Sequence, residues 1–269
     1  MDESARLQVE RPTAVPVKMQ AVAPGVHRYR DGLVNWYTIE DEGAISLVDT
    51  GWPRSWDRIE GGLREIGRLP SDVTAILLTH GHGDHLGAAE RARQETGAPV
   101  RCHREEVARV GGKKRGGSSL ALVPGLVPQL WRPASLRFVL HATAQGFLTP
   151  RWVKEVSPFE TGDELDVPGR PRVLFTPGHT EGHASFLLPG GVLLAGDALV
   201  TVDPVTNRPG PCLPHDAVNV DSERARESLS VLEEVEAQTL LPGHGEPWTQ
   251  GLKKAVERAR ASASASASA

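Results

Sequence analysis

The first regular pattern along the chain is a series of short β-rich runs, in which Val, Ile, Trp and Tyr recur between polar residues. These runs lie at residues 25–29, 34–39 and 44–49. Turn-forming residues separate them, with Asp-Gly at 31–32 and Asp-Glu-Gly at 41–43. Runs of this length joined by such turns predict an antiparallel meander.

The pattern changes to alternating helix and strand after residue 50. Four apolar residues recur at helical spacing between Pro53 and Pro70: Trp56, Ile59, Leu63 and Ile66. The segments that follow predict a buried strand, a helix that ends at Gly97 and a short strand, at residues 73–78, 86–95 and 100–103. Alternation of this kind is typical of an α/β layer.

The second half of the chain returns to strand patterns before another helix. A strand is expected at 173–175, and a hairpin at 184–194 turns through Pro-Gly-Gly at 189–191. A helical period then covers about 222–236, and a last strand is expected at 239–241.

The remaining segments define the expected domain organisation. Residues 1–20 lack a period and contain two prolines, so we expect an extended N-terminal arm before one domain at 21–260. Residues 104–160 break the rhythm of this domain with glycines, prolines, aromatic residues and a basic run. Two interpretations are open. These residues form either an inserted lid or pocket wall that contacts substrate, or an ordinary helical segment with a solvated loop. Residues 261–269 alternate Ala and Ser, which predicts a disordered tail.

Composition narrows the classes of function. Of 269 residues, 39% are hydrophobic, which is enough for a large core. The formal net charge is -4 with both signs interspersed, so nucleic acid is not an expected partner. No segment matches a membrane span or a signal peptide, and we therefore expect a cytoplasmic protein without a membrane partner. Cys102 and Cys212 lack metal-knuckle spacing and are expected to be small buried residues.

The densest chemistry directly follows the strand predicted at 73–78. The segment 79–85 reads THGHGDH and brings His80, His82, Asp84 and His85 within six residues. Imidazole and carboxylate groups are ligands for zinc, iron and manganese, and so dense a cluster is costly to bury without a cation. The glycines between these residues allow the backbone to turn tightly enough for their side chains to converge. The cluster therefore predicts a metal site at the carboxyl end of a strand.

Three later strands also end at a His or Asp next to a glycine. These residues are His179, Asp197 and His244. One polar residue after a strand is ordinary, whereas four strands that end in this way indicate a single shared site. His183 follows closely, but we interpret it as structural because the other seven side chains already complete the expected ligand set.

Asp49 ends the strand predicted at 44–49 and leaves two interpretations open. Its carboxylate either caps a turn or accepts a hydrogen bond that orients the metal-binding loop. His103, just past another strand, has no partner in the sequence and is interpreted as structural or exposed.

The ordered motifs resemble those of the metallo-β-lactamase superfamily over roughly residues 21 to 250. The motifs are Val-Asp-Thr-Gly at 48–51, Thr-His-Gly-His-Gly-Asp-His at 79–85, Thr-Pro-Gly-His at 176–179, Gly-Asp at 196–197 and Pro-Gly-His-Gly at 242–245. The resemblance implies an α/β fold, an αββα four-layer sandwich in which two mixed β-sheets are flanked by helices. It also implies a metal site along one edge of the sandwich.

The same resemblance implies a role for each ligand in a site for two divalent metal ions, with zinc first and iron or manganese as alternatives. The first ion would be held by His80, His82 and His179. The second would be held by Asp84, His85 and His244. Asp197 would bridge the two ions.

The resemblance further implies a metal-dependent hydrolase of the glyoxalase II-like or lactonase-like branch. We expect cleavage of an ester, thioester or lactone of a small molecule by a metal-bridging hydroxide, with Asp84 as the catalytic proton shuttle. The alternative is a mononuclear iron persulfide dioxygenase that uses His80, His179 and Asp197. The bridging Asp197 disfavours a true β-lactamase, because the lactamase branches generally lack that aspartate.

The sequence identifies no residue that binds the substrate and does not fix the oligomeric state. Only 25 residues follow His244, so we expect substrate recognition to come from the segment 104–160. Trp131, Trp152 and their apolar neighbours could also form the face of a homodimer.

Overall fold

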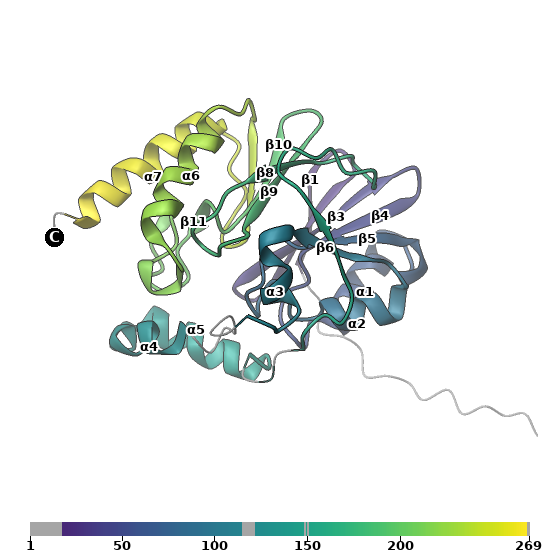
Figure 1. Ribbon diagram of the computed structural model, residues 1–269, viewed down its shortest axis with the longest axis horizontal. Coiled ribbons are helices and arrows are strands. Elements are labelled where there is room, and N and C mark those ends of the chain that lie inside the picture. The colour runs from purple at the N-terminus through teal and green to yellow at the C-terminus, as the bar shows by residue number, and fades with distance from the viewer. Residues whose placement is uncertain (1–17, 115–121, 148, 150, 268–269) are drawn as a thin grey trace, which may run out of the picture.

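The first sheet is formed by the N-terminal half of the chain and follows chain order from β1 to β7 (Figure 1). Its strands are β1 Lys18–Ala23, β2 Val26–Asp31, β3 Val34–Asp41, β4 Ala44–Val48, β5 Val73–Leu77, β6 Val100–His103 and β7 Val156–Phe159. The computed structural model describes residues 18–114, 122–147, 149 and 151–267. Strands β1 to β4 pair antiparallel and β4 to β7 pair parallel. The predicted meander and the predicted α/β layer are therefore two parts of one mixed sheet.

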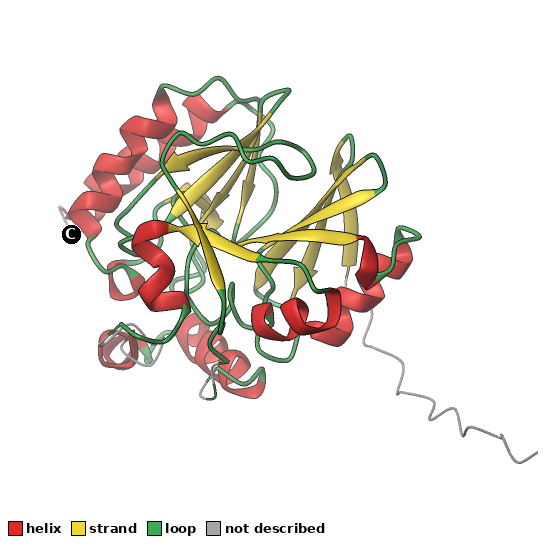
Figure 2. Cartoon of the chain, turned by 45° about the vertical axis from the view of Figure 1, so that its right-hand side comes forward, coloured by secondary structure: helices red, strands yellow, loops and turns green. Residues whose placement is uncertain are grey.

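The second sheet has the order β13-β10-β9-β8 and faces the first (Figure 2). Its strands are β8 Arg172–Phe175, β9 Ala184–Leu188, β10 Val192–Gly196 and β13 Thr239–Pro242. A two-stranded ribbon of β11 Val200–Val202 and β12 Pro209–Cys212 adjoins it. Strands β10 and β13 are parallel neighbours, so their carboxyl ends reach the same edge of the sheet.

Helices cover the outer faces of both sheets. The helices on the first sheet are α1 Trp56–Glu65, α2 Ala89–Thr96 and α3 Val107–Val110, and those on the second sheet are α6 Ser222–Glu233 and α7 Leu252–Ala267. Helix α2 ends at Gly97, whose φ of 74° is in the left-handed region that glycine adopts without strain. Helix α6 begins after Asp221, whose side chain accepts the Arg224 N–H as an N-cap.

Alternation along the central strands divides the core into layers. In β3, Trp36 packs under the helices of the first sheet, whereas the next residue, Tyr37, packs between the two sheets. In β5 the same division separates Ile76 from Leu77. This two-residue period is what the pleat of a strand covered on both faces requires. The order helix, sheet, sheet, helix confirms the αββα sandwich.

A helical hairpin lies below the two sheets in the view of Figure 1, formed by α4 Val123–Leu126 and α5 Pro133–Ala144. The short 3-10 turns are η1 Pro70–Asp72, η2 Arg104–Glu106, η4 Val127–Gln129 and η5 Asp216–Val218. The hairpin falls in the segment 104–160, which the sequence analysis treated as an insertion. That interpretation was too broad, because β7 at the end of this segment pairs with β6 and completes the first sheet.

The chain termini also differ from the prediction. Residues 18–20 were assigned to the extended arm, but β1 already begins at Lys18 and pairs with β2 through Arg30. Residues 1–17 lie outside the described part of the chain. The Ala-Ser tail was predicted to be disordered, yet α7 continues to Ala267. Alanine has the best helix propensity, and the preceding residues have already nucleated the helix.

Two further findings concern surfaces named in the sequence analysis. Trp131 is 75% exposed, whereas Trp152 is partly buried against the helical side of the first sheet. Within the described ranges, no helix combines the length and apolarity that crossing a membrane requires.

Candidate metal centre

All seven predicted ligands lie together, buried, at one edge of the sandwich. Three overlapping groups of nitrogen and oxygen atoms form among the described residues, each with its atoms within 4.8 Å of one another. The groups are His80, His82 and His179; His80, His85 and Asp197; and Asp84, His85 and His244. The first and third groups are the two ligand sets that the family resemblance implied. Each group is able to hold a metal ion.

Glycine next to the ligands makes this convergence possible. The Gly243 N–H donates to the Gly196 carbonyl at 2.8 Å, which locks together the ends of β13 and β10. A Cβ atom on Gly243 would lie 2.1 Å from Oδ1 of Asp197. Gly196 itself has a φ of 53°. Any side chain at position 243 would therefore displace Asp197 from its place between the groups.

Asp197 lies between the first and the third group. Its Oδ2 is 3.3 Å from Nε2 of His179 and 3.2 Å from Nε2 of His244. Its Oδ1 is 3.6 Å from Nε2 of His85. Nε2 of His244 also lies 3.4 Å from Oδ2 of Asp84. One carboxylate thus faces nitrogens of both groups, as a bridging ligand must.

Hydrogen bonds from the Nδ1 atoms orient two of the imidazoles. His179 donates from Nδ1 to Oδ1 of Asn219 at 2.8 Å, and His244 donates from Nδ1 to the Leu33 carbonyl at 2.6 Å. A ring that carries its proton on Nδ1 presents the lone pair of Nε2. Neighbouring residues therefore fix these two rings with the Nε2 lone pair directed toward the centre, where it can bind a metal ion.

Asp49 does the same for His80 and His85, in the loop that follows β5. Its Oδ2 lies 2.8 Å from Nδ1 of His85 and accepts a bond from the Thr79 hydroxyl at 2.8 Å. Because that hydroxyl donates to Asp49, it accepts the Nδ1 proton of His80 at 3.0 Å. Asp49 has a φ of 57° and is buried. Of the two interpretations left open for Asp49, these contacts are the ones that the orienting interpretation requires.

Polar atoms aimed into the centre show that the residues fit a cation. Nε2 of His80, Nε2 of His85 and Oδ1 of Asp197 are buried and have no hydrogen-bond partner among the described residues. Nδ1 of His82 lies 2.9 Å from Nε2 of His179 and can donate to it, which leaves Nε2 of His82 as a further buried acceptor without a partner among the described residues. Burying such acceptors without a donor is costly, whereas a cation among them satisfies several at once. Zinc, iron and manganese all suit this donor set.

The protonation equilibria of the ligands are perturbed in opposite directions. Burial lowers the pKa of His80 well below its usual range, and neighbouring imidazoles lower it further. For His85 burial acts in the same direction, but the carboxylates of Asp197, Asp49 and Asp84 outweigh it and raise the pKa to about 10. A shift in both directions within one small site is typical of functional centres.

Two residues that the sequence analysis did not select, Glu106 and Asn219, hold the ligand loops in place. Glu106 accepts the Gly81 N–H with one oxygen and the Gly182 N–H with the other, both at 2.8 Å. Asn219 orients His179, as described above. Glu106 closely follows β6 on the same sheet edge, so the rule that strand ends carry the chemistry would have found it. Asn219 lies in a loop without any such signal.

His183 is structural, as predicted, but it acts on the centre. Its Nε2 accepts the Asp197 N–H at 3.0 Å, so Nδ1 carries the proton and donates to the Thr176 hydroxyl at 2.9 Å. Burial lowers the pKa of this imidazole to about 3. His103 is also structural, since it is buried and stacks on Phe175 with ring centroids 4.3 Å apart.

Comparison with known proteins agrees with this geometry. The model of the metallo-beta-lactamase superfamily matches residues 29–244. The probable metallo-hydrolase YflN of Bacillus subtilis is 33% identical over 242 residues, which are 84% of this chain and 86% of YflN. The crystal structure of the metallo-beta-lactamase family protein TTHA1429 from Thermus thermophilus is 30% identical with a TM-score of 0.66, covering 91% of this chain and 81% of that one. Hydroxyacylglutathione hydrolase GloC of Haemophilus influenzae is 26% identical over 149 residues, covering 55% of this chain and 57% of GloC.

Proposed function

The chain belongs to the metallo-β-lactamase superfamily and is a metal-dependent hydrolase, and from this premise we propose that it uses two metal ions to cleave an ester, thioester or lactone of a small molecule. Zinc is the proposed metal, because imidazole nitrogen dominates the donor set. The relative GloC is named a hydroxyacylglutathione hydrolase, and hydroxyacylglutathione is a thioester. That name supports a carbonyl compound as substrate.

The position of Asp197 carries the proposal for two ions. Its carboxylate lies within 3.6 Å of nitrogens from both ligand groups, and each group supplies three further protein ligands. A pair of bound metal ions would make water more acidic and polarise a substrate carbonyl. Side chains assembled for two ions favour hydrolysis of a carbonyl compound over chemistry that needs one ion.

The protein's own residues would position the reactants and move the proton. Asp84 is buried and approaches His244 through Oδ2. Its second oxygen, Oδ1, would take the proton that water releases and deliver it to the leaving group. His85 and His244 would hold their Nε2 atoms beside Asp84, because Asp49 and Leu33 fix their Nδ1 protons.

The alternative, a mononuclear iron persulfide dioxygenase, would need only His80, His179 and Asp197. That function would leave the buried group of Asp84, His85 and His244 without a purpose. The cost of burying an unused carboxylate and two imidazoles argues against it.

Stepwise metal addition tests the proposal. Protein stripped with a chelator receives zero, one or two equivalents of zinc per chain and is assayed on a γ-lactone, an acyl thioester and an aryl ester. We expect the rate on at least one substrate to reach its maximum only at the second equivalent. A maximum at one equivalent, or oxygen uptake with glutathione persulfide on protein loaded with one iron, would contradict the proposal.

A further inference from the structure

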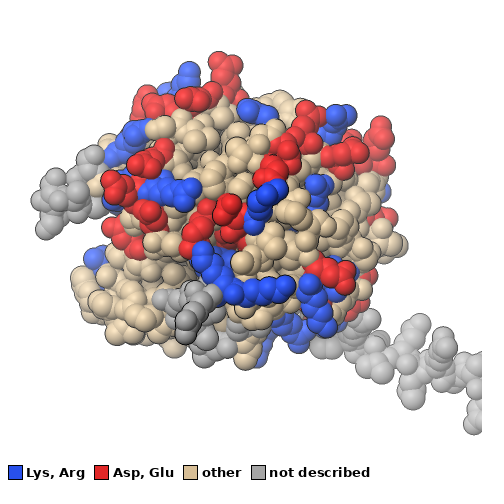
Figure 3. Space-filling view, in the orientation of Figure 1, with Lys and Arg blue, Asp and Glu red and all other residues tan. Residues whose placement is uncertain are grey.

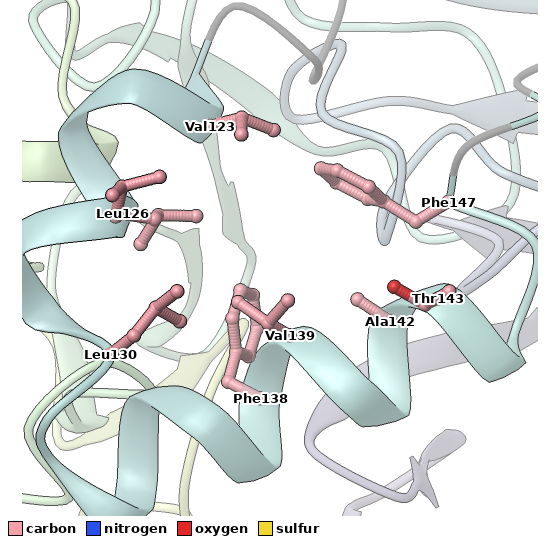
Figure 4. Close-up of a pocket in the computed structure, with 9 residues that line it drawn as sticks. Val123, Leu126, Leu130, Phe138, Val139, Ala142, Thr143 and Phe147 are labelled. Carbon is pink, nitrogen blue, oxygen red and sulfur yellow. The ribbon is translucent and has the colours of Figure 1, made fainter.

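An apolar cavity lies between α4, η4 and α5, outside the metal centre (Figure 4). Its volume is about 70 Å³, and nine residues line it. Leu126 of α4, Phe138 of α5 and Phe147 point toward its centre, and Thr143 is the sole lining residue with a polar side chain. No charged group lines the cavity, so its interior favours a hydrocarbon over any polar ligand.

The wall of this cavity is part of an apolar cluster that extends to the chain neighbours of two residues that orient metal ligands. Leu126, Phe138 and Phe147 pack in one cluster with Val34 and Val218. The backbone contact agrees, because a Cβ atom on the α4 glycine at position 125 would lie 3.0 Å from the Ala217 carbonyl. The hairpin therefore sits directly against the loop at 217–219.

Two ligand histidines are anchored on the neighbours of that cluster. Val218 is followed by Asn219, which accepts the Nδ1 proton of His179. Val34 is preceded by Leu33, whose carbonyl accepts the Nδ1 proton of His244. In both cases, the residue that bonds to the metal ligand is the chain neighbour of a residue in the apolar cluster. The apolar cluster that walls the cavity thus lies next to the residues that orient two of the ligands.

Exposed apolar side chains continue the cavity outward. Val123 is 40% exposed, Val127 is 55% exposed and Leu130 is 36% exposed, and all three line the cavity. Figure 3 shows a largely uncharged surface over α4 and α5 at the lower left. A soluble protein seldom exposes several large apolar residues in one place unless they bind something.

Resting on the proposed function, we propose that this cavity binds the acyl chain of the substrate, so that the enzyme prefers linear aliphatic acyl groups of medium length over the acetyl group. An apolar cavity of roughly 150 Å³ takes the six carbons of benzene, so about 70 Å³ holds about three carbons. Longer chains would extend over Val123, Val127 and Leu130.

The chain-length profile of the wild-type enzyme is the first test. Initial rates are measured on 4-nitrophenyl acetate, butanoate, hexanoate, octanoate and decanoate. Each methylene that the cavity buries should raise kcat/KM about fourfold, until the cavity is filled and the profile levels off. Binding of sodium octanoate to metal-free protein, followed by calorimetry, provides a readout that needs no catalysis. Its heat-capacity change should be negative, the sign of apolar burial.

A pair of variants on one helix locates the effect. Val139→Phe fills the cavity from α5, whereas Leu140→Phe adds a ring at the next residue, which is 62% exposed and does not line it. We expect Val139→Phe to lower the ratio of octanoate to acetate kcat/KM at least tenfold and to abolish octanoate binding. Leu140→Phe should leave the ratio unchanged. Melting temperatures of both variants show whether they fold.

The outcomes separate the two proposals. In one outcome, octanoate binds, Val139→Phe abolishes this binding, and the protein hydrolyses no ester, thioester or lactone. That result would contradict the proposed function and leave the cavity assignment in place. Hydrolysis with a flat chain-length profile and no octanoate binding would overturn the cavity assignment alone. Light scattering could also show a dimer that Val139→Phe dissociates and that octanoate does not affect. That result would assign the cavity to contact with a second copy of the chain and would overturn the acyl-chain proposal.

Discussion

Oδ2 of Asp49 lies 2.8 Å from Nδ1 of His85, and both side chains are buried. Asp49 directly follows β4, and His85 lies in the loop after the neighbouring parallel strand β5. The same carboxylate accepts two bonds from Thr79, at its N–H and its hydroxyl. Asp49 therefore fixes the tautomer of one ligand directly and that of His80 through Thr79. Partners of this kind tune metal affinity although they touch no metal.

Replacing Asp49 with Asn should weaken metal binding without emptying the site. The amide cannot accept the His85 proton and both Thr79 bonds in the same way, so His85 loses its fixed orientation. We expect zinc affinity to fall about 10- to 100-fold. Competition with a chromogenic chelator measures this affinity. Asp57→Asn, on the exposed side of α1, is the matched control and should bind zinc as the wild type does.

Glu106→Gln tests the link between two ligand loops. Glu106 accepts one backbone N–H with each oxygen, and a glutamine amide would point its NH2 group at one of those donors. An unsatisfied buried N–H costs about 1–3 kcal/mol, so the free energy of unfolding of the metal-free protein should fall by that amount. Urea denaturation measures it. Glu105→Gln changes the adjacent exposed glutamate, and an equal loss there would refute the role given to Glu106.

The buried His183 should make the metal-free protein less stable in acid. Its pKa is about 3 in the fold and about 6.5 in the unfolded chain, so only the unfolded chain takes up this proton between those values. This contribution to stability is therefore complete above pH 6.5 and is lost as the pH falls toward 3. The slope attributable to His183 is about 1.4 kcal/mol per pH unit.

His183→Gln isolates that contribution, because its Oε1 can still accept the Asp197 N–H but does not titrate. Free energies of unfolding between pH 6 and pH 4.5 should depend less steeply on pH in the variant than in the wild type. Identical slopes for the two proteins would show that His183 is protonated in the fold as readily as in the unfolded chain.

Removal of the metal should lower the stability of the fold, because the ligands lie together at one edge of the sandwich. Nε2 of His80, Nε2 of His85 and Oδ1 of Asp197 find no hydrogen-bond partner in the described part of the chain, and a bound metal ion would satisfy them. Zinc at one hundred times its dissociation constant stabilises the folded state by about 2.7 kcal/mol per site. Thermal unfolding with and without a chelator should show a lower melting temperature after chelation that zinc restores. Magnesium, which prefers oxygen ligands, should not restore it.

Much of the centre follows from strand ends and glycine positions alone. His80, His179, Asp197 and His244 each follow an apolar run that a strand pattern identifies, and adjacent strands bring their ends to one edge. The family resemblance added the division into two ligand groups. Asn219 had no local signal, because its role depends on how a loop between distant elements packs against His179.

The fold was also predictable where one face of an element is apolar. Strands β2 to β6, the four strands of the second sheet and helices α1, α2 and α6 match the predicted segments closely. Strand β7 was missed because Pro158 and exposed neighbours hide its pattern, and its pairing with β6 supplies the stabilisation. Helix α7 was missed because the Ala-Ser repeat resembles low-complexity sequence, although alanine favours helix.

The number of zinc ions per chain tests the central claim most directly. Elemental mass spectrometry on protein purified without chelator, together with Asp197→Ala and the control His27→Gln, counts the ions that each variant holds. His27 lies on β2 and belongs to none of the ligand groups. The account predicts two ions in the wild type and in His27→Gln, and no more than one in Asp197→Ala. A single ion in the wild type, or two ions retained without Asp197, would contradict it.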